Sequence, residues 1–435
     1  MGARDTALCA LIACRKEGAW VNAALKANLA RDRLDRRDAA LATRLCYGVL
    51  QNRLLLDFYL RQLVTGSLRR LRPITLDVLR LGLYQLYFMD KIPPSAVVNE
   101  AVSQTRRFGD QGAAGLVNAV LRGADRRRGQ LREPEDLATR YSHPQPLVDL
   151  LARDLGQEKL EAVLAADNEA PETVLQHNPL RGDASALRAG VEADGGELTP
   201  HPWLPGCYVL RGGGSPESLG AYREGLVYVQ DAASRLAVAC AELRPGMEVL
   251  DCCAAPGGKS LAAAIALQDQ GSVYAADLYP HKAALIEKNA GRLGLTCIKP
   301  MVRDASAPDP AFAGRMDAVL ADVPCSGLGI IRKKPDIRYK DLPALEELPS
   351  LQLRILLAQA DCVKPGGVLL YSTCTLLRRE NEQVVRAFLA RRPEFRLQSL
   401  PLPDELDQDG SGMLTLLPGA HGTDGFFICK LRRSE

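Results

Sequence analysis

The spacing of apolar residues along this chain changes twice, which predicts three regions of different structure. From residue 6 to about 130, apolar residues recur at helical spacing with few strand signals. From about 131 to 235, short helical stretches give way to short strand-like runs with glycine-rich turns between them. From about 236 onward, predicted strands and helices alternate, which is typical of a parallel sheet covered by helices on both faces.

Particular segments carry these patterns. In the first region, Pro93-Pro94-Ser95 interrupts the helical spacing and predicts a helix that begins at Ala96 with Ser95 as its cap. In the second region, the predicted strands are Thr173–Gln176, Glu197–His201 and Cys207–Leu210. In the third, the predicted strands are Met247–Leu250, Ser272–Ala276, Met316–Leu320 and Val368–Tyr371, with a closing antiparallel pair at Met413–Leu417 and Gly425–Lys430.

A chain of 435 residues is too long for one hydrophobic core, so the regions are read as domains. We predict an all-α domain over residues 1–140, a small α+β connector over 141–235 and an α/β domain over 236–435. The first domain is basic: residues 1–140 hold 24 Lys and Arg against 14 Asp and Glu, whereas the rest hold 31 against 38. Such an asymmetry favours an anionic partner such as nucleic acid, although a solvated helical surface would produce it too.

Composition excludes several other classes of protein. No apolar run is long enough to span a bilayer, and the N-terminus lacks a signal-peptide pattern, so we expect a cytoplasmic protein with no membrane partner. The twelve cysteines include no Cys-x-x-Cys pair, and the five histidines are dispersed. We therefore expect reduced thiols and no metal site.

Two cysteines follow two of the predicted parallel strands. Cys325 lies in Asp-Val-Pro-Cys-Ser-Gly after Met316–Leu320, and Cys374 lies in Tyr-Ser-Thr-Cys-Thr after the strand that ends at Tyr371. Ligands of open parallel sheets bind beyond the carboxyl ends of the strands. Both thiols should therefore face one pocket, as covalent catalysis would require.

The loop Ala254–Ser260 opens the helix after the first of these strands, and its pattern differs from the common phosphate-binding loops. Cys253 occupies the position where a Walker loop requires glycine, which disfavours a nucleotide hydrolase, and no Gly-x-Gly-x-x-Gly is present. A tight Pro-Gly-Gly turn lets the backbone approach a small cofactor closely. We predict as cofactor-binding residues Ala254, Ala255, Pro256, Gly257, Gly258, Lys259 and Ser260.

Acidic residues recur at the ends of the later strands. Asp277 is placed to accept hydrogen bonds from ribose hydroxyls, and Asp304 is placed to meet an adenine amino group. Asp322 ends the strand that precedes Cys325. A single acidic residue in a loop is usually a cap, but three in succession after a glycine loop favour cofactor binding.

The segments DCCAAPGGKS, ADVPCSGLGIIRKKPDI and YSTCTLLRRENEQVV resemble the RNA (cytosine-5) methyltransferases, in particular the bacterial 16S ribosomal RNA enzymes of the Sun/Fmu (RsmB) type. The C-terminal PGAHGTDGFFICKL fits as well, and PPSAVVNEAV with GLVNAVLR resembles the NusB-like RNA-binding domain of that branch. The resemblance implies a Rossmann-like methyltransferase domain at 236–435 that depends on S-adenosylmethionine. It also implies a substrate, 16S ribosomal RNA, in which the family's target is cytosine 967.

The resemblance also implies roles for four side chains. Cytosine C5 is a poor nucleophile, so a thiolate must first add to C6, and the family assigns this attack to the cysteine at the position of Cys374. Cys325 then assists breakdown of the covalent adduct. Asp322 hydrogen-bonds the cytosine edge around N3 and N4, and Lys259 is a second polar candidate near the site.

The sequence is also compatible with other assignments. Cys325 is the nucleophile if the chain follows DNA cytosine-5 methyltransferases, which leaves the Thr-Cys motif idle. The same chemistry could serve another ribosomal or transfer RNA cytosine, and a catalytically silent RNA-binding protein could use the NusB-like domain alone. The basic residues after each thiol, including Arg332, Arg338 and Arg378, are candidates for phosphate contacts.

Overall fold

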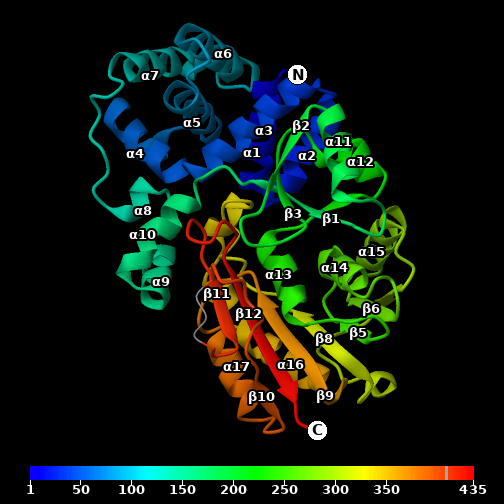
Figure 1. The fold of residues 1–435 in the computed structure, drawn as a ribbon. Helices are drawn as coiled ribbons and strands as arrows, with labels where there is room; N and C mark the ends of the chain where they lie inside the picture. The colour runs from blue at the N-terminus through cyan, green and yellow to red at the C-terminus, as the bar shows by residue number, and fades with distance from the viewer. Residues whose placement is uncertain (407–409) are drawn as a thin grey trace. The chain divides into compact units, whose positions relative to one another are not determined.

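The computed structural model of this chain describes residues 1–406 and 410–435, which pack into two units (Figure 1). Unit 1 comprises residues 1–169 together with the short segment 331–340, and unit 2 comprises 170–330 and 341–435. The predicted fold class is confirmed, with a helical N-terminal part and a C-terminal Rossmann-like part. The three domain boundaries stay a prediction.

Unit 1 is helical throughout its described secondary structure. Its helices are α1 (Ala3–Glu17), α2 (Val21–Asp32), α3 (Arg36–Gln51), α4 (Arg53–Leu63), α5 (Pro73–Phe88), α6 (Pro94–Arg107), α7 (Ala114–Arg126), α8 (Leu137–Arg140), α9 (Gln145–Leu155) and α10 (Gln157–Ala166). On α5, Leu79, Leu83 and Leu86 recur at helical spacing and are buried in one hydrophobic cluster with the neighbouring helices. The predicted cap is wrong: α6 already begins at Pro94, because proline suits the first turn, and Ser95 lies inside it.

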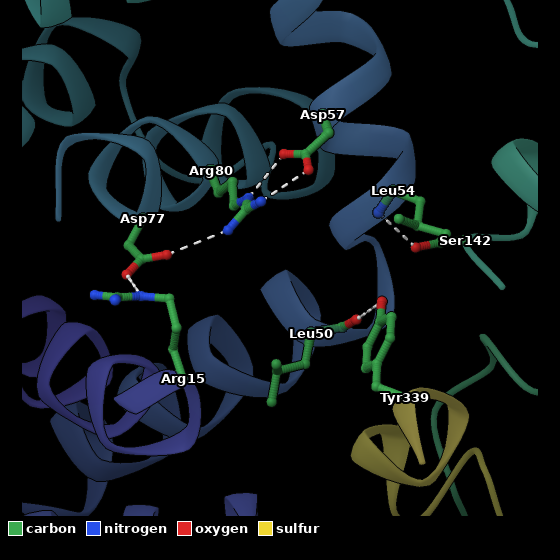
Figure 2. Close-up of polar contacts among 8 residues, drawn as sticks. All are labelled: Arg15, Leu50, Leu54, Asp57, Asp77, Arg80, Ser142 and Tyr339. Atoms are coloured by element: carbon green, nitrogen blue, oxygen red, sulfur yellow. Dashed lines mark hydrogen bonds and ion pairs between the residues drawn. The ribbon is translucent and has the colours of Figure 1, made fainter. Parts of the chain in front are cut away.

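The segment 331–340 fastens to unit 1 through its short helix Pro335–Tyr339. Arg338 is almost fully buried, and its guanidinium donates to the carbonyl oxygens of Gln51 (2.7 Å) and Ser142 (3.1 Å) and to Oδ1 of Asn168 (3.0 Å). The hydroxyl of Tyr339 donates to the carbonyl of Leu50 (3.0 Å), as Figure 2 shows. These hydrogen bonds give the buried guanidinium its acceptors and join the segment 331–340 to the rest of unit 1.

Unit 2 begins with a small antiparallel sheet in the order β2-β3-β1-β4. Its strands are β1 (Thr173–His177), β2 (Gly196–Pro200), β3 (Cys207–Gly212) and β4 (Val227–Val229), with helices α11 (Ala184–Ala193) and α12 (Gly220–Arg223). The three strands predicted for this region are all present. Together they confirm the α+β character expected of it.

The larger sheet of unit 2 has the order β10-β12-β9-β8-β5-β6-β7, with β11 paired to β12. Its strands are β5 (Glu248–Asp251), β6 (Ser272–Asp277), β7 (Ile298–Val302), β8 (Met316–Asp322), β9 (Val363–Thr373), β10 (Phe395–Leu397), β11 (Met413–Leu416) and β12 (Phe426–Arg433). The strands from β9 to β7 are parallel, and β12 pairs antiparallel with β9, β10 and β11. The predicted closing antiparallel pair is confirmed.

Helices cover both faces of this sheet, as Figure 1 shows. One hydrophobic cluster joins the sheet to α13 (Ala232–Cys240), α14 (Gly258–Ala266) and α15 (Pro280–Leu293), and another joins it to α16 (Leu348–Ala360) and α17 (Glu382–Leu389). Neighbouring residues such as Leu369 and Leu370 belong to opposite clusters, as the alternation of a strand buried on both faces requires.

The strand order reverses between β5 and β8, because the chain adds β6 and β7 on one side and returns to add β8 on the other. This switch point lies between the carboxyl ends at Asp251 and Asp322, and such points are where open α/β sheets bind ligands. Among residues 1–406 and 410–435, no helix is long and apolar enough to cross a bilayer. The same residues hold no cluster of three or more side chains placed to bind a metal ion.

Candidate active site

The two predicted cysteines meet beyond the ends of β8 and β9. These strands are in parallel register with Asp322 opposite Ser372, so the loops that follow them start side by side. The Sγ atoms of Cys325 and Cys374 lie 3.2 Å apart. The structure therefore brings together two thiols that the sequence only predicted to face one pocket.

Polar contacts hold the two cysteine loops against each other. The Ser326 backbone N–H donates to a carboxylate oxygen of the buried Glu380 (2.8 Å), and the Ser326 and Thr375 hydroxyls lie 2.6 Å apart. The N–H of Gly329 donates to the carbonyl oxygen of Cys374 (2.9 Å). The separation of the two thiols is therefore fixed by backbone and buried side chains.

Gly329 allows this close approach because it has no side chain. A Cβ atom at this position would lie 2.0 Å from the carbonyl oxygen of Gly425, whose own N–H donates to the Gly329 carbonyl at 2.7 Å. Any larger residue would push the backbone apart here. Gly329, the second glycine of the Ser-Gly-Leu-Gly sequence after Cys325, therefore joins the cysteine loop to the segment before β12.

A cavity of about 270 Å³ opens beside Cys374. Five of the seven loop residues predicted to bind a cofactor line it: Ala254, Ala255, Pro256, Gly258 and Lys259. Gly257 instead supports the turn, with φ +107, a conformation that glycine adopts without strain. Ser260 lies in the first turn of α14, where its hydroxyl donates to Oδ2 of Asp251 (2.6 Å).

Lys259 and Asp322 form an ion pair in the wall of this cavity. The Nζ atom lies 2.6 Å from Oδ2 of Asp322, and the hydroxyl of Ser372 donates to the other carboxylate oxygen (2.8 Å). The ammonium group also lies 5.1 Å from the centre of the Phe426 ring. Both predicted polar residues thus lie at the mouth of the switch point, oriented by partners on β9 and β12.

Asp251, at the end of β5, is a fully buried carboxylate that faces the cavity. Burial raises its pKa from 3.8 to about 6, and the hydrogen bond from Ser260 opposes that rise. Its Oδ1 atom has no hydrogen-bond partner among the described residues. An orphaned acceptor beside a glycine turn fits a ligand that brings its own donor, such as the amino or hydroxyl groups of S-adenosylmethionine.

The other two predicted acidic residues occupy different environments. Asp277 is buried, and its carboxylate accepts from the backbone N–H of Ala255 (3.2 Å), so it holds the cofactor loop in place. Asp304 is exposed and outside the cavity wall, where it accepts from the N–H and hydroxyl of Ser306. These hydrogen bonds lower its pKa. The contacts of both residues with a cofactor stay predictions.

Cys325 and Cys374 are partly exposed, whereas seven of the twelve cysteines are buried. The hydrogen bond with Cys374 and burial raise the pKa of Cys325 well above its ordinary value. Burial raises the pKa of Cys240 to about 12 and also raises that of Cys362, so both remain protonated thiols in the core. Cys253, by contrast, is partly exposed in the wall of the cavity.

Sequence reasoning missed part of the cavity wall. The additional residues are Gln230, Asp231 and Ser234 at the start of α13, Ile330 after the first cysteine loop, and Asp424 and Phe426 at the start of β12. The available signal was position inside the motif segments, because Ile330 lies in ADVPCSGLGIIRKKPDI, and Asp424 and Phe426 lie in PGAHGTDGFFICKL. Position within a strand or loop alone did not distinguish them.

The prediction that Arg338 contacts phosphate is wrong. Arg338 is buried in unit 1 with its guanidinium bound to carbonyl oxygens, so it presents no donor to a phosphate. Arg332 is buried as well, whereas Lys334 is exposed. A basic run after a catalytic motif does not by itself reveal which of its members fold inward.

Comparisons with known proteins cover nearly the whole chain. The family described as 16S rRNA methyltransferase RsmB/F matches residues 238–432, and the NusB family matches residues 1–126. The "Probable ribosomal RNA small subunit methyltransferase B" of Bacillus subtilis is 36% identical over 99% of this chain and 98% of its own length. The ribosomal RNA small subunit methyltransferase B of Vibrio cholerae is 34% identical over 93% of this chain and 92% of its own.

Solved structures resemble the chain too. The crystal structure of PH0851 has a TM-score of 0.81 at 25% identity, covering 98% of both chains. The crystal structure of NSun6 from Pyrococcus horikoshii with SFG has a TM-score of 0.59 at 20% identity and covers 67% of this chain and 98% of its own. The latter likeness is one of fold.

Proposed function

The chain belongs to the RsmB/F family of 16S rRNA methyltransferases, and from this premise we propose that it methylates carbon 5 of a cytosine in 16S ribosomal RNA, in the cytoplasm, through a covalent cysteine adduct. The family's target, cytosine 967, is the specific nucleotide we propose. One observation carries the choice of chemistry: the Sγ atoms of Cys325 and Cys374 are 3.2 Å apart beside the cofactor cavity.

S-adenosylmethionine, the methyl donor of this class of enzyme, supplies an electrophilic methyl group. The residues fit such a ligand, because the wall of the cavity combines Gly258, at the end of the glycine turn, with Asp251, whose Oδ1 atom has no hydrogen-bond partner among the described residues. The backbone from Ala254 to Pro256 lies in the wall, held by the Asp277 carboxylate.

Cys374 acts as the nucleophile in this proposal. Its sulfur forms a bond to cytosine C6, and the electron pair of the C5–C6 double bond moves to C5, which makes C5 nucleophilic. Cys374 lines the cavity and can therefore reach a base placed beside the cofactor. The ammonium group of Lys259 stabilises the negative charge that develops on the cytosine ring. The carboxylate of Asp322, which is paired with Lys259, orients the edge of the base around N3 and N4.

Cys325 completes the cycle. After methylation, the proton at C5 must leave, the C6–sulfur bond must break, and the double bond forms again. The raised pKa of Cys325 keeps this thiol protonated while Cys374 is the nucleophile. At the elimination step a base beside the adduct receives the C5 proton, and Cys325 is 3.2 Å from the sulfur that leaves.

The decisive experiment uses RNA in which cytosine is replaced by 5-fluorocytosine. The fluorine atom replaces the C5 hydrogen that would leave as a proton, and fluorine cannot leave in this way. The adduct should therefore persist as a denaturant-stable protein–RNA complex in the presence of S-adenosylmethionine. Wild type should form it and Cys374→Ala should not. Cys325→Ala should accumulate adduct even on natural RNA, because breakdown is the step that it assists.

The other outcomes assign the chemistry differently. Loss of adduct only in Cys325→Ala would make Cys325 the nucleophile. No adduct with any variant, despite verified binding of S-adenosylmethionine, would contradict the covalent mechanism. A Cys429→Ala variant is a matched control, because that thiol is fully buried in the other hydrophobic cluster of the sheet.

A further inference from the structure

Unit 1 contains a cavity of its own, distinct in composition from the methyltransferase cavity. It has a volume of about 340 Å³, within the range of small-ligand sites. Apolar side chains from α1 and α3 line part of it, including Leu11, Val49 and Leu50. The short helix Pro335–Tyr339, which follows the first cysteine motif in the chain, supplies another part of the wall through Asp336 and Tyr339.

The charged side chains of this cavity are held by specific partners, several of which Figure 2 shows. The Arg80 guanidinium makes two bonds of 2.7 Å to Asp57 and a third of 3.3 Å to Asp77. Asp77 also accepts from Nε of Arg15 (2.9 Å). Both oxygens of Asp77 are therefore used by arginines, and the carboxylate does not repel an incoming anion as a free one would.

Two arginines keep donors that could bind a ligand. Arg15 makes its hydrogen bond through Nε, which leaves its two terminal amino groups without a hydrogen-bond partner among the described residues. The guanidinium of Arg53 stacks on the ring of Tyr339, 3.5 Å from its centre, and donates no hydrogen bond within the part of the chain that is described. Arginine terminal groups of this kind suit phosphate oxygens.

The cavity also has an aromatic surface and an unsatisfied acceptor. Trp20 lines it and is 51% exposed, which is unusual for so large an apolar side chain. Oδ1 of Asp336 is buried and has no hydrogen-bond partner in the described residues, while Oδ2 accepts from the N–H of Val21 (2.9 Å). Burial and the Asp336 carboxylate raise the pKa of Cys14 to about 11, so that thiol adds no charge.

We propose that this cavity binds one unpaired nucleotide of the RNA substrate. Arg15 and Arg53 hold its phosphate, Trp20 stacks on its base, and the orphaned oxygen of Asp336 accepts from an amino group of the base. A site with arginine donors, an exposed indole and a lone acceptor matches a nucleotide, because a simple anion would use neither Trp20 nor Asp336. The inference rests on the proposed function for the identity of the RNA and adds where a second nucleotide is held.

The experiment uses the full chain with Trp203→Phe. Because the sequence has two tryptophans, Trp20 then becomes the sole indole and its fluorescence reports on this cavity. A single-stranded RNA oligonucleotide should quench it saturably, whereas a blunt duplex of the same sequence and the polyanion heparin should not. Arg53→Ala in the same background should raise the dissociation constant about tenfold, while Arg69→Ala, an exposed arginine elsewhere in unit 1, should leave it unchanged.

A second variant keeps the test sharp if Arg53→Ala does not fold. Trp20→Ala removes a half-exposed side chain. The affinity of this variant for fluorescently labelled 16S RNA should fall about tenfold, whereas its affinity for S-adenosylmethionine should not change. Unchanged RNA affinity in Trp20→Ala, or equal quenching by heparin and oligonucleotide, would overturn the proposal. The 5-fluorocytosine experiment separates the two proposals. If the wild type forms the adduct but RNA does not quench Trp20, only the proposed nucleotide site is contradicted. If RNA quenches Trp20 but no adduct forms, only the proposed covalent chemistry is contradicted.

Discussion

The sulfur atoms of Cys325 and Cys374 lie 3.2 Å apart although 49 residues separate them in the chain. The parallel register of β8 and β9 sets this distance, and Gly329 fixes it through its hydrogen bond to the Cys374 carbonyl. Each thiol therefore belongs to the other's electrostatic environment. A change at one should alter the proton affinity of the other.

We expect Cys374→Ala to lower the pKa of Cys325. The contact with Cys374 is the largest cause of the raised pKa, ahead of burial, so its removal should shift the titration toward the ordinary thiol value. Alkylation of Cys325 by iodoacetamide, followed by peptide mass spectrometry over a range of pH, measures this shift. Cys429 is buried and should stay unreactive in both proteins. An unchanged profile for Cys325 would show that burial alone sets its pKa.

Lys259 and Asp322 should be coupled in stability as well as in chemistry. Their side chains are 9% and 30% exposed, so Lys259→Met leaves a largely buried carboxylate without its cation. We expect a loss of about 2 kcal/mol in the free energy of unfolding, of which Asp322→Asn in the same chain recovers part. Urea unfolding of the two single variants and the double variant measures the coupling.

Lys282 offers a matched control for this pair. It lies 3.4 Å from Asp277, but its side chain is 41% exposed. Lys282→Met should cost less than about 1 kcal/mol, because the solvent screens the exposed ammonium group and Asp277 keeps its hydrogen bond from the N–H of Ala255. Equal losses in Lys259→Met and Lys282→Met would contradict the importance of burial at the active site.

Asp251 should give the stability of unit 2 a dependence on pH. Its pKa is raised from 3.8 to about 6, so the folded state holds its proton more tightly than the unfolded state does. The resulting stabilisation is fully present below about pH 4 and is lost as the pH rises through about 6, by roughly 2–3 kcal/mol in total. Asp251→Asn should remove this loss, as urea midpoints across that pH window would show.

Asp304 provides the opposite case. Hydrogen bonds from Ser306 lower the pKa of Asp304. Its contribution to the stability of the folded state is therefore present above the ordinary carboxyl pKa and is lost as the pH falls. Asp304→Asn should therefore leave intact the fall in stability between about pH 4 and 6 that Asp251 produces. The prediction for Asp251 fails if wild type and Asp251→Asn keep a constant difference throughout this window.

Arg338 should be among the most sensitive positions of unit 1. Arg338→Met would remove the donor that the carbonyl oxygens of Gln51 and Ser142 share, of which the Ser142 contact is buried, and this should cost about 3 kcal/mol. Arg338→Lys should recover only part, because one ammonium cannot reproduce a planar guanidinium. The emission of Trp20 in a Trp203→Phe background follows unfolding of this unit. Lys334→Met, at an exposed position, should change little.

The sequence predicted the arrangement of the methyltransferase sheet well but missed its edges. β7 and β10 are the outermost strands, and β7 contains Pro300, which is tolerated there because an edge strand has one side without a partner. The strands buried on both faces were found because their apolar runs are continuous. Ser95 was misplaced because Pro94 can itself begin a helix.

The active site was predictable where a motif carried it and unpredictable where only tertiary structure brought residues together. Cys325, Cys374 and Lys259 are local to recognised segments, and the structure places them at one switch point. The partners of Asp251 and the inward fold of Arg338 depend on contacts across the chain. No periodicity in the sequence reports such contacts, since a buried arginine looks like a solvated one until its acceptors are known.

The excursion of residues 331–340 into unit 1 has a consequence for biosynthesis. The helices of unit 1 leave the ribosome first, but Arg338 and Tyr339 are translated only after the strands up to β8. At typical elongation rates this delay is roughly 10–30 s. The first helices must wait during that interval without the hydrogen bonds that Arg338 donates to the carbonyl oxygens of Gln51 and Ser142. The N-terminal unit reaches its final form only after β5 to β8 have been synthesised, before β9 to β12 follow.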